Sequence, residues 1–225
     1  MNPWTQFEQA SCLPDNCQCE LTRDALIRHP SAFWSSLAYM IAAWAIYREI
    51  ANKSLELKLW AGVCALMGFS SLFGHASFIN FALAMDFASI ILVLSFFALL
   101  NLLLLLKQSI LKILIYFFIY YICLFVAMYY MNKWAKIGFC LLIFAFSMGD
   151  VIRETGWRFL KARTLQLSLL VLFFSFGMFV VDEMHLGCEP EAWFQWHSMW
   201  HIGTAISMYY YGKWRFTSDG TDPAR

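Results

Sequence analysis

The sequence has few charged side chains: only 14% of its 225 residues are Asp, Glu, Lys or Arg, whereas 61% are hydrophobic. A soluble domain is nearer about one quarter charged and one half apolar. The formal net charge is only +1, and the chain has neither a basic tract nor a Gly-rich phosphate loop. These absences argue against a nucleic-acid partner and predict an integral membrane protein.

The first 30 residues are polar and mixed in charge, so the sequence does not predict a cleavable signal peptide. We therefore expect the first apolar run to act as an uncleaved signal anchor. Nothing in the sequence suggests an internal repeat, a second domain or a soluble module. We expect an external N-terminal segment (1–30), one seven-helix membrane domain (31–215) and a disordered cytoplasmic tail (216–225).

Apolar runs of the length that crosses a bilayer, about 20 residues, recur seven times. The connections between them are short, so successive helices should be antiparallel neighbours. We therefore predict an all-α integral membrane protein, a bundle of seven transmembrane helices. The runs cover residues 31–47, 57–78, 82–106, 109–130, 134–152, 164–184 and 193–214.

The lysines and arginines of the loops indicate how this bundle is oriented. With seven alternating spans, one side carries 12 of these residues and the other carries 4. The richer side is cytoplasmic by the positive-inside rule, which places the N-terminus outside and the C-terminus inside. All five histidines then fall in the external half, together with Asp86 and Asp182.

The seven cysteines fall into two groups. Three lie inside apolar runs, where cysteine commonly serves as a small buried residue: Cys64, Cys123 and Cys140. Four lie in polar segments on the external side and are candidates for disulfides if that side is oxidising: Cys12, Cys17, Cys19 and Cys188.

His197 and His201 stand four residues apart, so on a helix both imidazoles share one face. An alternative is that one bonds a neighbouring helix while the other lies at the membrane interface. His75, near the outer end of run 57–78, lies at the same depth, although alone it also suits a helix end that faces headgroups. Three neutral imidazoles with one open position make a catalytic zinc site. We expect these three histidines to be metal ligands.

Ser71 and Asp86 are the candidate catalytic residues. Ser71 precedes His75 by one helical turn, where its hydroxyl could bind a developing oxyanion or its own i−4 carbonyl. Asp86 lies in an apolar segment, where a carboxylate is costly without a partner. It could act as a general base, orient a ligand histidine or cap a helix; we favour function over the cap, because the helix begins near Ala82.

Other charged residues at the ends of runs suit structural roles. Asp182, Glu183 and His185 end run 164–184, and we interpret them as a solvated helix terminus. Asp150 and Arg153 belong to a charge cluster at the cytoplasmic end of run 134–152, which is most simply a set of interfacial ion pairs.

Considered together, Ser71-xxx-His75, Asp86 eleven residues later and His197-xxx-His201 resemble the alkaline ceramidases. These belong to the CREST superfamily, with the adiponectin and progestin receptors and the Per1-like proteins. The resemblance extends over nearly the whole chain, from the Cys-Glu pair at residues 19–20 to the last apolar run. The spacing of the whole set is far more specific than any of its parts.

The resemblance implies seven helices around a zinc ion held by the three histidines, with Ser71 and Asp86 completing the site. In that family the reaction is hydrolysis of the ceramide amide, which releases a fatty acid and a long-chain base. The partner is then a ceramide-like lipid in the membrane. The resemblance also implies a disulfide between Cys19 and Cys188.

The sequence departs from that family at its calcium site. Glu20 matches, but Cys17, Thr22 and Ala32 stand where acidic or amide residues are usual, which argues against calcium regulation. Short loops and this simpler N-terminus resemble a bacterial member, located in the inner membrane with its site toward the periplasm. Such a member could act on another lipid amide.

Three alternatives remain open at the level of sequence. A receptor or signalling bundle could hold a structural zinc. A haem-binding electron carrier could use histidines on separate helices, although a pair four apart on one helix suits a single iron poorly. A hydrolase of a lipid ester would use the same residues as an amidase.

Overall fold

A computed structural model describes residues 2–10, 18–50, 54–156 and 162–217. Within these residues the regular structure is helical, and an isolated bridge between Gln9 and Ile79 is the one extended pairing. A 3₁₀ turn, η1, covers Pro3–Gln6. The α-helices are α1 (Pro30–Ser35), α2 (Leu37–Glu49), α3 (Leu55–Ser77), α4 (Asn80–Leu105), α5 (Ile110–Tyr130), α6 (Lys133–Thr155), α7 (Arg163–Glu183) and α8 (Trp196–Phe216).

Five helices among the described residues are long and apolar enough to cross a membrane: α3, α4, α5, α6 and α7. Helices α1 and α2 are individually too short, and α8 contains two histidines and several hydroxyl side chains. Each predicted apolar run is helical within about three residues of its expected bounds. The protein is therefore a helical bundle with the character of a membrane protein.

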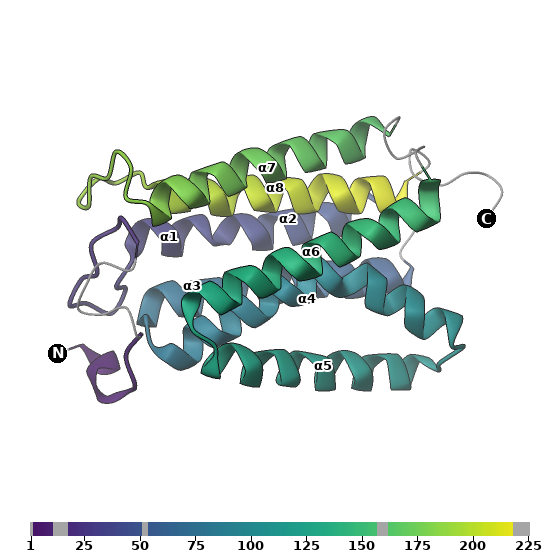
Figure 1. The fold of residues 1–225 in the computed structure, drawn as a ribbon, viewed down its shortest axis with the longest axis horizontal. Coiled ribbons are helices and arrows are strands. Elements are labelled where there is room, and N and C mark those ends of the chain that lie inside the picture. The colour runs from purple at the N-terminus through teal and green to yellow at the C-terminus, as the bar shows by residue number, and fades with distance from the viewer. Residues whose placement is uncertain (1, 11–17, 51–53, 157–161, 218–225) are drawn as a thin grey trace.

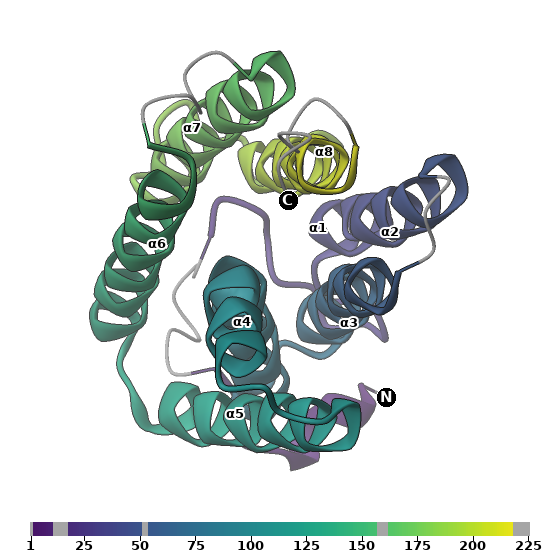
Figure 2. The ribbon, with the colours of Figure 1, turned by 90° about the vertical axis from the view of Figure 1, so that its right-hand side faces the viewer.

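The helices run side by side, and loops gather at the two ends of the bundle (Figure 1). Viewed along the bundle, α4 lies inside a ring formed by its neighbours (Figure 2). It packs against α3, α5 and α6, while α8 packs against α7, α2 and α1. The segment before α1 and the connection from α7 to α8 share one end, and that end carries the histidines discussed below.

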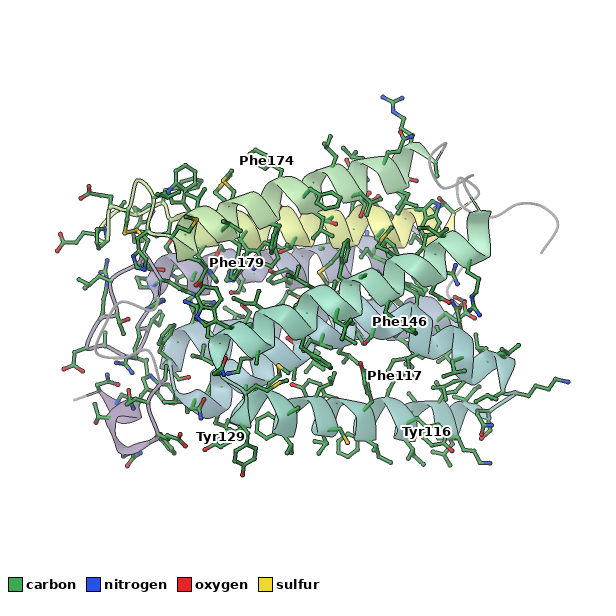
Figure 3. All side chains as sticks on the ribbon, in the orientation of Figure 1. Tyr116, Phe117, Tyr129, Phe146, Phe174 and Phe179 are labelled. Atoms are coloured by element: carbon green, nitrogen blue, oxygen red, sulfur yellow. A yellow bond between two sulfur atoms is a disulfide. The ribbon has the colours of Figure 1, made fainter. Side chains whose placement is uncertain are left out.

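Side chains sort by polarity as expected for a bundle in lipid. Large apolar side chains on the outer helices project away from the bundle, as Phe146 and Phe174 do (Figure 3). The interior contains an aromatic cluster in which Trp60, Phe96 and Phe97 pack together. An apolar exterior around a packed interior is stable in a bilayer and costly in water.

Small residues allow a close contact between α7 and α8. At Gly203 of α8, an added Cβ would lie 1.9 Å from the Ser175 hydroxyl oxygen of α7. Membrane helices associate through such small residues, because lipid offers no hydrophobic drive for association. This contact fixes α8 against α7 one half-turn beyond His201.

The first predicted helix, residues 31–47, differs from the structure because it is interrupted at Ser36. The Ser36 hydroxyl donates to the Ala32 carbonyl at 2.8 Å and contacts the Ser71 hydroxyl at 3.0 Å. Its oxygen is also 3.2 Å from Nδ1 of His201. The interruption therefore lies where α1–α2 meets the helices that carry the histidines. The expected tail (216–225) lies almost entirely outside the described residues, as do Cys12 and Cys17.

Candidate metal centre

Three histidines from two helices converge at one end of the bundle. His75 lies in the last turn of α3, while His197 and His201 lie in the first turns of α8. One ring nitrogen from each lies within 4.8 Å of the others. All three side chains are at least 95% buried. The alternatives of a headgroup-facing His75 and an interfacial His197 or His201 are therefore wrong.

Oxygen acceptors fix the orientation of His201. Its Nδ1 lies 3.1 Å from the Ala32 carbonyl oxygen and 3.0 Å from the Ser35 hydroxyl. The carbonyl only accepts, and the Ser35 hydroxyl already donates to it. Nδ1 of His201 therefore carries the proton, and the lone pair of Nε2 is free to face the other two histidines.

Asp182 fixes the orientation of His197. Its Oδ2 lies 3.4 Å from Nδ1 of His197, longer than a good hydrogen bond but close for a charge contact. Asp182 is fully buried, so the expectation of a solvated terminus is wrong for this residue. A carboxylate behind an imidazole holds the ring with Nε2 toward a metal.

His75 has two ring nitrogens that are buried and lack hydrogen-bond partners among the described residues. An unpaired buried polar atom is costly, and a metal ion between the three imidazoles would satisfy the inward nitrogen. The donor set suits zinc and other borderline divalent metals. The residues present therefore fit the predicted metal.

Asp86 and Ser71 stand beside this cluster. Asp86 is the seventh residue of α4, well past its N-cap, so it does not cap the helix. It is 8% exposed, and its Oδ1 has no hydrogen-bond partner among the described residues. Ser71 contacts Ser36 rather than its own i−4 carbonyl and lies close enough to Asp86 to interact with the carboxylate. Both residues line the same cavity as the histidines.

Residues 18–29, before α1, cover the centre at this end of the bundle and add a residue that sequence reasoning missed. Nε2 of Gln18 donates to Nε2 of His197 at 3.2 Å, and its Oε1 accepts from Nδ1 of His29 at the same distance. The Thr22 hydroxyl then donates to Nε2 of His29 at 2.7 Å. Burial lowers the pKa of His29 to about 3, so the ring is neutral and can link Thr22 to Gln18.

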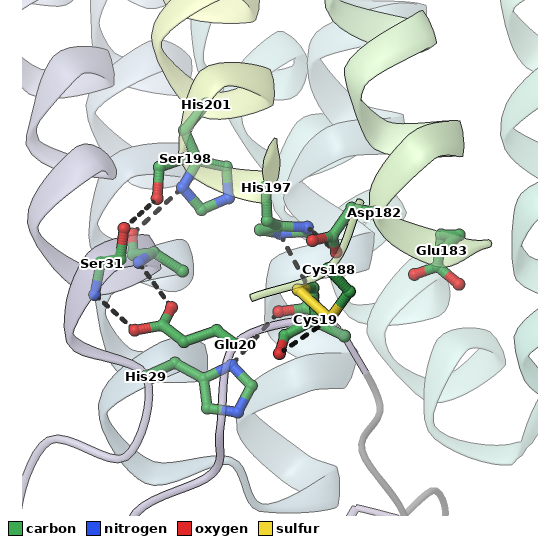
Figure 4. Close-up of polar contacts among 12 residues, drawn as sticks. Cys19, Glu20, His29, Ser31, Asp182, Glu183, Cys188, His197, Ser198 and His201 are labelled. Carbon is green, nitrogen blue, oxygen red and sulfur yellow. Dashed lines mark hydrogen bonds and ion pairs between the residues drawn. A yellow bond between two sulfur atoms is a disulfide. The ribbon is translucent and has the colours of Figure 1, made fainter. Parts of the chain in front are cut away.

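Two further contacts hold this segment in place (Figure 4). The Glu20 carboxylate accepts from the backbone N–H groups of Ser31 at 2.7 Å and Ala32 at 3.0 Å, at the start of α1. Burial raises the pKa of Glu20, against the opposing effect of these two bonds. Cys19 and Cys188 form a disulfide with Cα atoms 5.5 Å apart, as the family resemblance implied.

A cavity of about 340 Å³ extends from the histidines into the bundle. Its walls come mainly from α4, α6, α7 and α8, and they are mostly apolar beyond the metal centre. Along α6 the lining runs from Lys133 to Val151, about 27 Å at the rise of an α-helix. The cavity is therefore long, and its charged and imidazole side chains lie at the histidine end, whereas the more distant lining is apolar apart from hydroxyl groups such as those of Ser147 and Ser168.

Neither a family model, nor a curated protein, nor a solved structure matches this chain.

Proposed function

We propose that the chain is a membrane-embedded zinc amidohydrolase that cleaves the N-acyl amide of ceramide or a similar lipid. The products are a fatty acid and a long-chain amine. The observation that carries this proposal is the position of three buried histidines, with Asp86 and Ser71, at the polar end of a long apolar cavity. The resemblance to alkaline ceramidases, which rests on the spacing of the same residues, supports the same reaction.

His75, His197 and His201 would hold the metal. A zinc ion with three imidazole ligands keeps one open position and supplies a Lewis acid that acidifies water and polarises a carbonyl. His201 and His197 are already oriented for this by the Ala32 carbonyl and Asp182. Pre-oriented ligands lose little freedom on binding, which favours a site that holds its metal permanently.

Asp86 is the group placed to move protons. Its carboxylate accepts a proton from the water whose oxygen attacks the amide carbonyl carbon. The C–N bond then breaks, and the same carboxyl group gives the proton to the departing nitrogen. A metal on His197 would take the Nε2 lone pair to which the Gln18 amide now donates, and that amide would then be released beside the cluster. The Ser71 hydroxyl, which contacts Ser36, is a second donor there, and both suit the negative charge that develops on the carbonyl oxygen.

The apolar length of the cavity suits the acyl chain of the substrate. Side chains such as Phe144, Leu172 and Met208 line it beyond the histidines. Burial of a long chain there would supply binding energy that positions the amide at the catalytic residues. This separation of a polar reaction centre from an apolar channel favours a lipid over a soluble amide.

The proposed topology has seven crossings. Helices α1 and α2 together contain about 20 residues, about 30 Å and enough for one interrupted crossing; α8 supplies the seventh. The Lys and Arg distribution puts the histidine end outside and the C-terminus inside. In a bacterial cell this is the inner membrane, with the site toward the periplasm.

The test combines metal analysis with turnover. Protein purified in detergent should contain about one zinc per chain and should release fatty acid from ceramide, as measured by mass spectrometry. His75→Ala should lose both zinc and activity, whereas Asp86→Asn should keep zinc and lose activity. His185→Ala and Asp24→Asn are matched controls, because both residues are exposed at the same end of the bundle.

The outcomes separate the rival functions. A native chain without zinc would refute the proposal. Zinc without turnover of amide or ester lipids would favour a receptor with a structural metal. A matched ester substrate distinguishes an esterase from an amidase, and a visible absorption spectrum identifies haem.

A further inference from the structure

A buried lysine lies in the cavity near the metal centre. Lys136 belongs to the first turn of α6, and its side chain lines the cavity on the same face as Cys140 and Phe144. Only 8% of the residue is exposed, although lysine is almost never this buried without a partner. A cation in such a place calls for a negative group close to it.

The described residues do not supply that negative group. Lys136 lies over the ring of Phe87, with its Nζ 5.2 Å from the ring centroid, and no carboxylate among the described residues pairs with it. Lys133, one turn earlier, differs because it forms an ion pair with Glu183. The aromatic ring offsets only a small part of the cost of burying the charge. Among the described residues, Lys136 is thus a cation without an anion.

The position of Lys136 relates it to the reaction. Phe87 follows Asp86 in α4, and both residues line the cavity together with Lys136. Beyond Lys136, the cavity-facing side chains of α6 become mostly apolar toward the opposite end of the bundle. A lipid amide whose acyl chain occupies the apolar part and whose carbonyl lies at the histidines would bring its remaining polar group to the same end as Lys136.

We propose that Lys136 binds an anionic group, a carboxylate or phosphate, on the headgroup side of the lipid. The preferred substrate is then an acidic N-acyl lipid, which the protein would bind more tightly than a neutral one such as ceramide. This inference rests on the proposed function for the bond that is cut, but the anion site itself does not require catalysis. An ammonium presents three donors and a point charge, which suits either anion.

The first experiment measures binding without turnover. Metal-free full-length protein in nonionic detergent is titrated with hexadecyl phosphate and with hexadecanol, which differ in the charged headgroup. A charge-assisted contact predicts about tenfold to 100-fold tighter binding of the phosphate. Lys136→Met should abolish this preference, and Lys136→Arg should retain it. Lys112→Met, which removes an exposed charge from the opposite end of the bundle, should behave as the wild type.

The second experiment measures turnover of a matched pair, N-palmitoylglycine and N-palmitoylethanolamine. Wild-type protein should prefer the glycine conjugate, and Lys136→Met should reduce its kcat/KM by about tenfold or more while changing that of the ethanolamide less than twofold. Lys136→Gln provides a second neutral variant should the methionine protein misfold. Palmitate binding to the wild type and to Lys136→Met shows whether the lysine binds the carboxylate of the fatty acid product instead of an anion in the headgroup.

The results distinguish the two proposals. Anion-selective binding that depends on Lys136, without hydrolysis of either amide, keeps the anion site and rejects the hydrolase. Hydrolysis of both amides with no charge preference keeps the hydrolase and rejects the anion site. A Lys136 effect confined to palmitate also rejects a headgroup site, because the lysine would then serve product binding alone.

Discussion

Replacement of Asp182 should weaken metal binding without touching a metal ligand. Asp182 is fully buried and lies 3.4 Å from Nδ1 of His197, on the side of the ring away from the other histidines. Removing the carboxylate frees the ring to turn and to exchange its tautomer. Loss of such a partner typically costs about 10- to 100-fold in metal affinity, or about 1.4 to 2.7 kcal/mol.

The two substitutions at this position should differ in size. The side-chain oxygen of Asp182→Asn can still accept from Nδ1, so we expect a loss near the lower limit, about tenfold. Asp182→Ala leaves the nitrogen buried without an acceptor, and the loss should approach about 100-fold. Zinc dissociation constants follow from competition with a chromophoric chelator in detergent.

Glu183→Gln provides the control, because it removes the same charge one residue later in the chain. Glu183 pairs with Lys133 and does not contact the histidines through a hydrogen bond or ion pair. Its zinc affinity should stay within about twofold of the wild type, well below the loss at Asp182. An Asp182→Ala protein that binds zinc as tightly as the wild type would show that Asp182 does not hold His197.

Three further predictions concern the segment that closes the site. Cys19→Ser and Cys188→Ser should each lower the thermal unfolding temperature. The double variant should be no less stable than either single variant, because the same disulfide is lost in all three. A larger loss of stability in the double variant would contradict this pairing. Burial lowers the pKa of His29 to about 3, so below about pH 6.5 the unfolded chain binds more protons at this residue than the folded chain does. As the pH falls from about 7.5 to 5, metal-free protein should therefore lose about 2 kcal/mol of unfolding free energy from this group. Denaturant titrations should show a shallower pH dependence for His29→Asn. Gln18→Ala should keep zinc but lower kcat by about tenfold or more, and unchanged turnover would remove Gln18 from the reaction.

The candidate metal ligands could be predicted from sequence because their signal is local. A spacing of four residues puts His197 and His201 on one helical face, and alternating spans bring His75 to their depth. Asp86 could be predicted because a carboxylate inside an apolar run is costly and is rarely present without a functional role. In each case the helix itself supplied the geometry, and the structure places all four side chains in one cavity.

The residues around these ligands could not be predicted in the same way. Asp182 ends a helix, where a solvated carboxylate is ordinary, and its burial depends on the segments that fold over that end. Gln18 reaches His197 across 179 positions of sequence, through a segment without regular structure. Lys136 resembles an interfacial lysine in the sequence, because only the packing of α6 against α4 turns its side chain inward.

Helix α8 shows how the polar side chains of a buried site make a membrane crossing hard to recognise from hydropathy. The residues that face the cavity include His197, His201, Thr204 and Ser207, and these polar side chains lower the apolar character by which a crossing is recognised. In the bundle they are buried, and Thr204 and Ser207 hydrogen-bond to Tyr39 and Ser168 respectively. Their polarity therefore costs little in the folded protein, because each hydroxyl has a partner and lipid does not reach it. The helix least apolar by sequence is thus the one whose buried face carries two of the three candidate metal ligands.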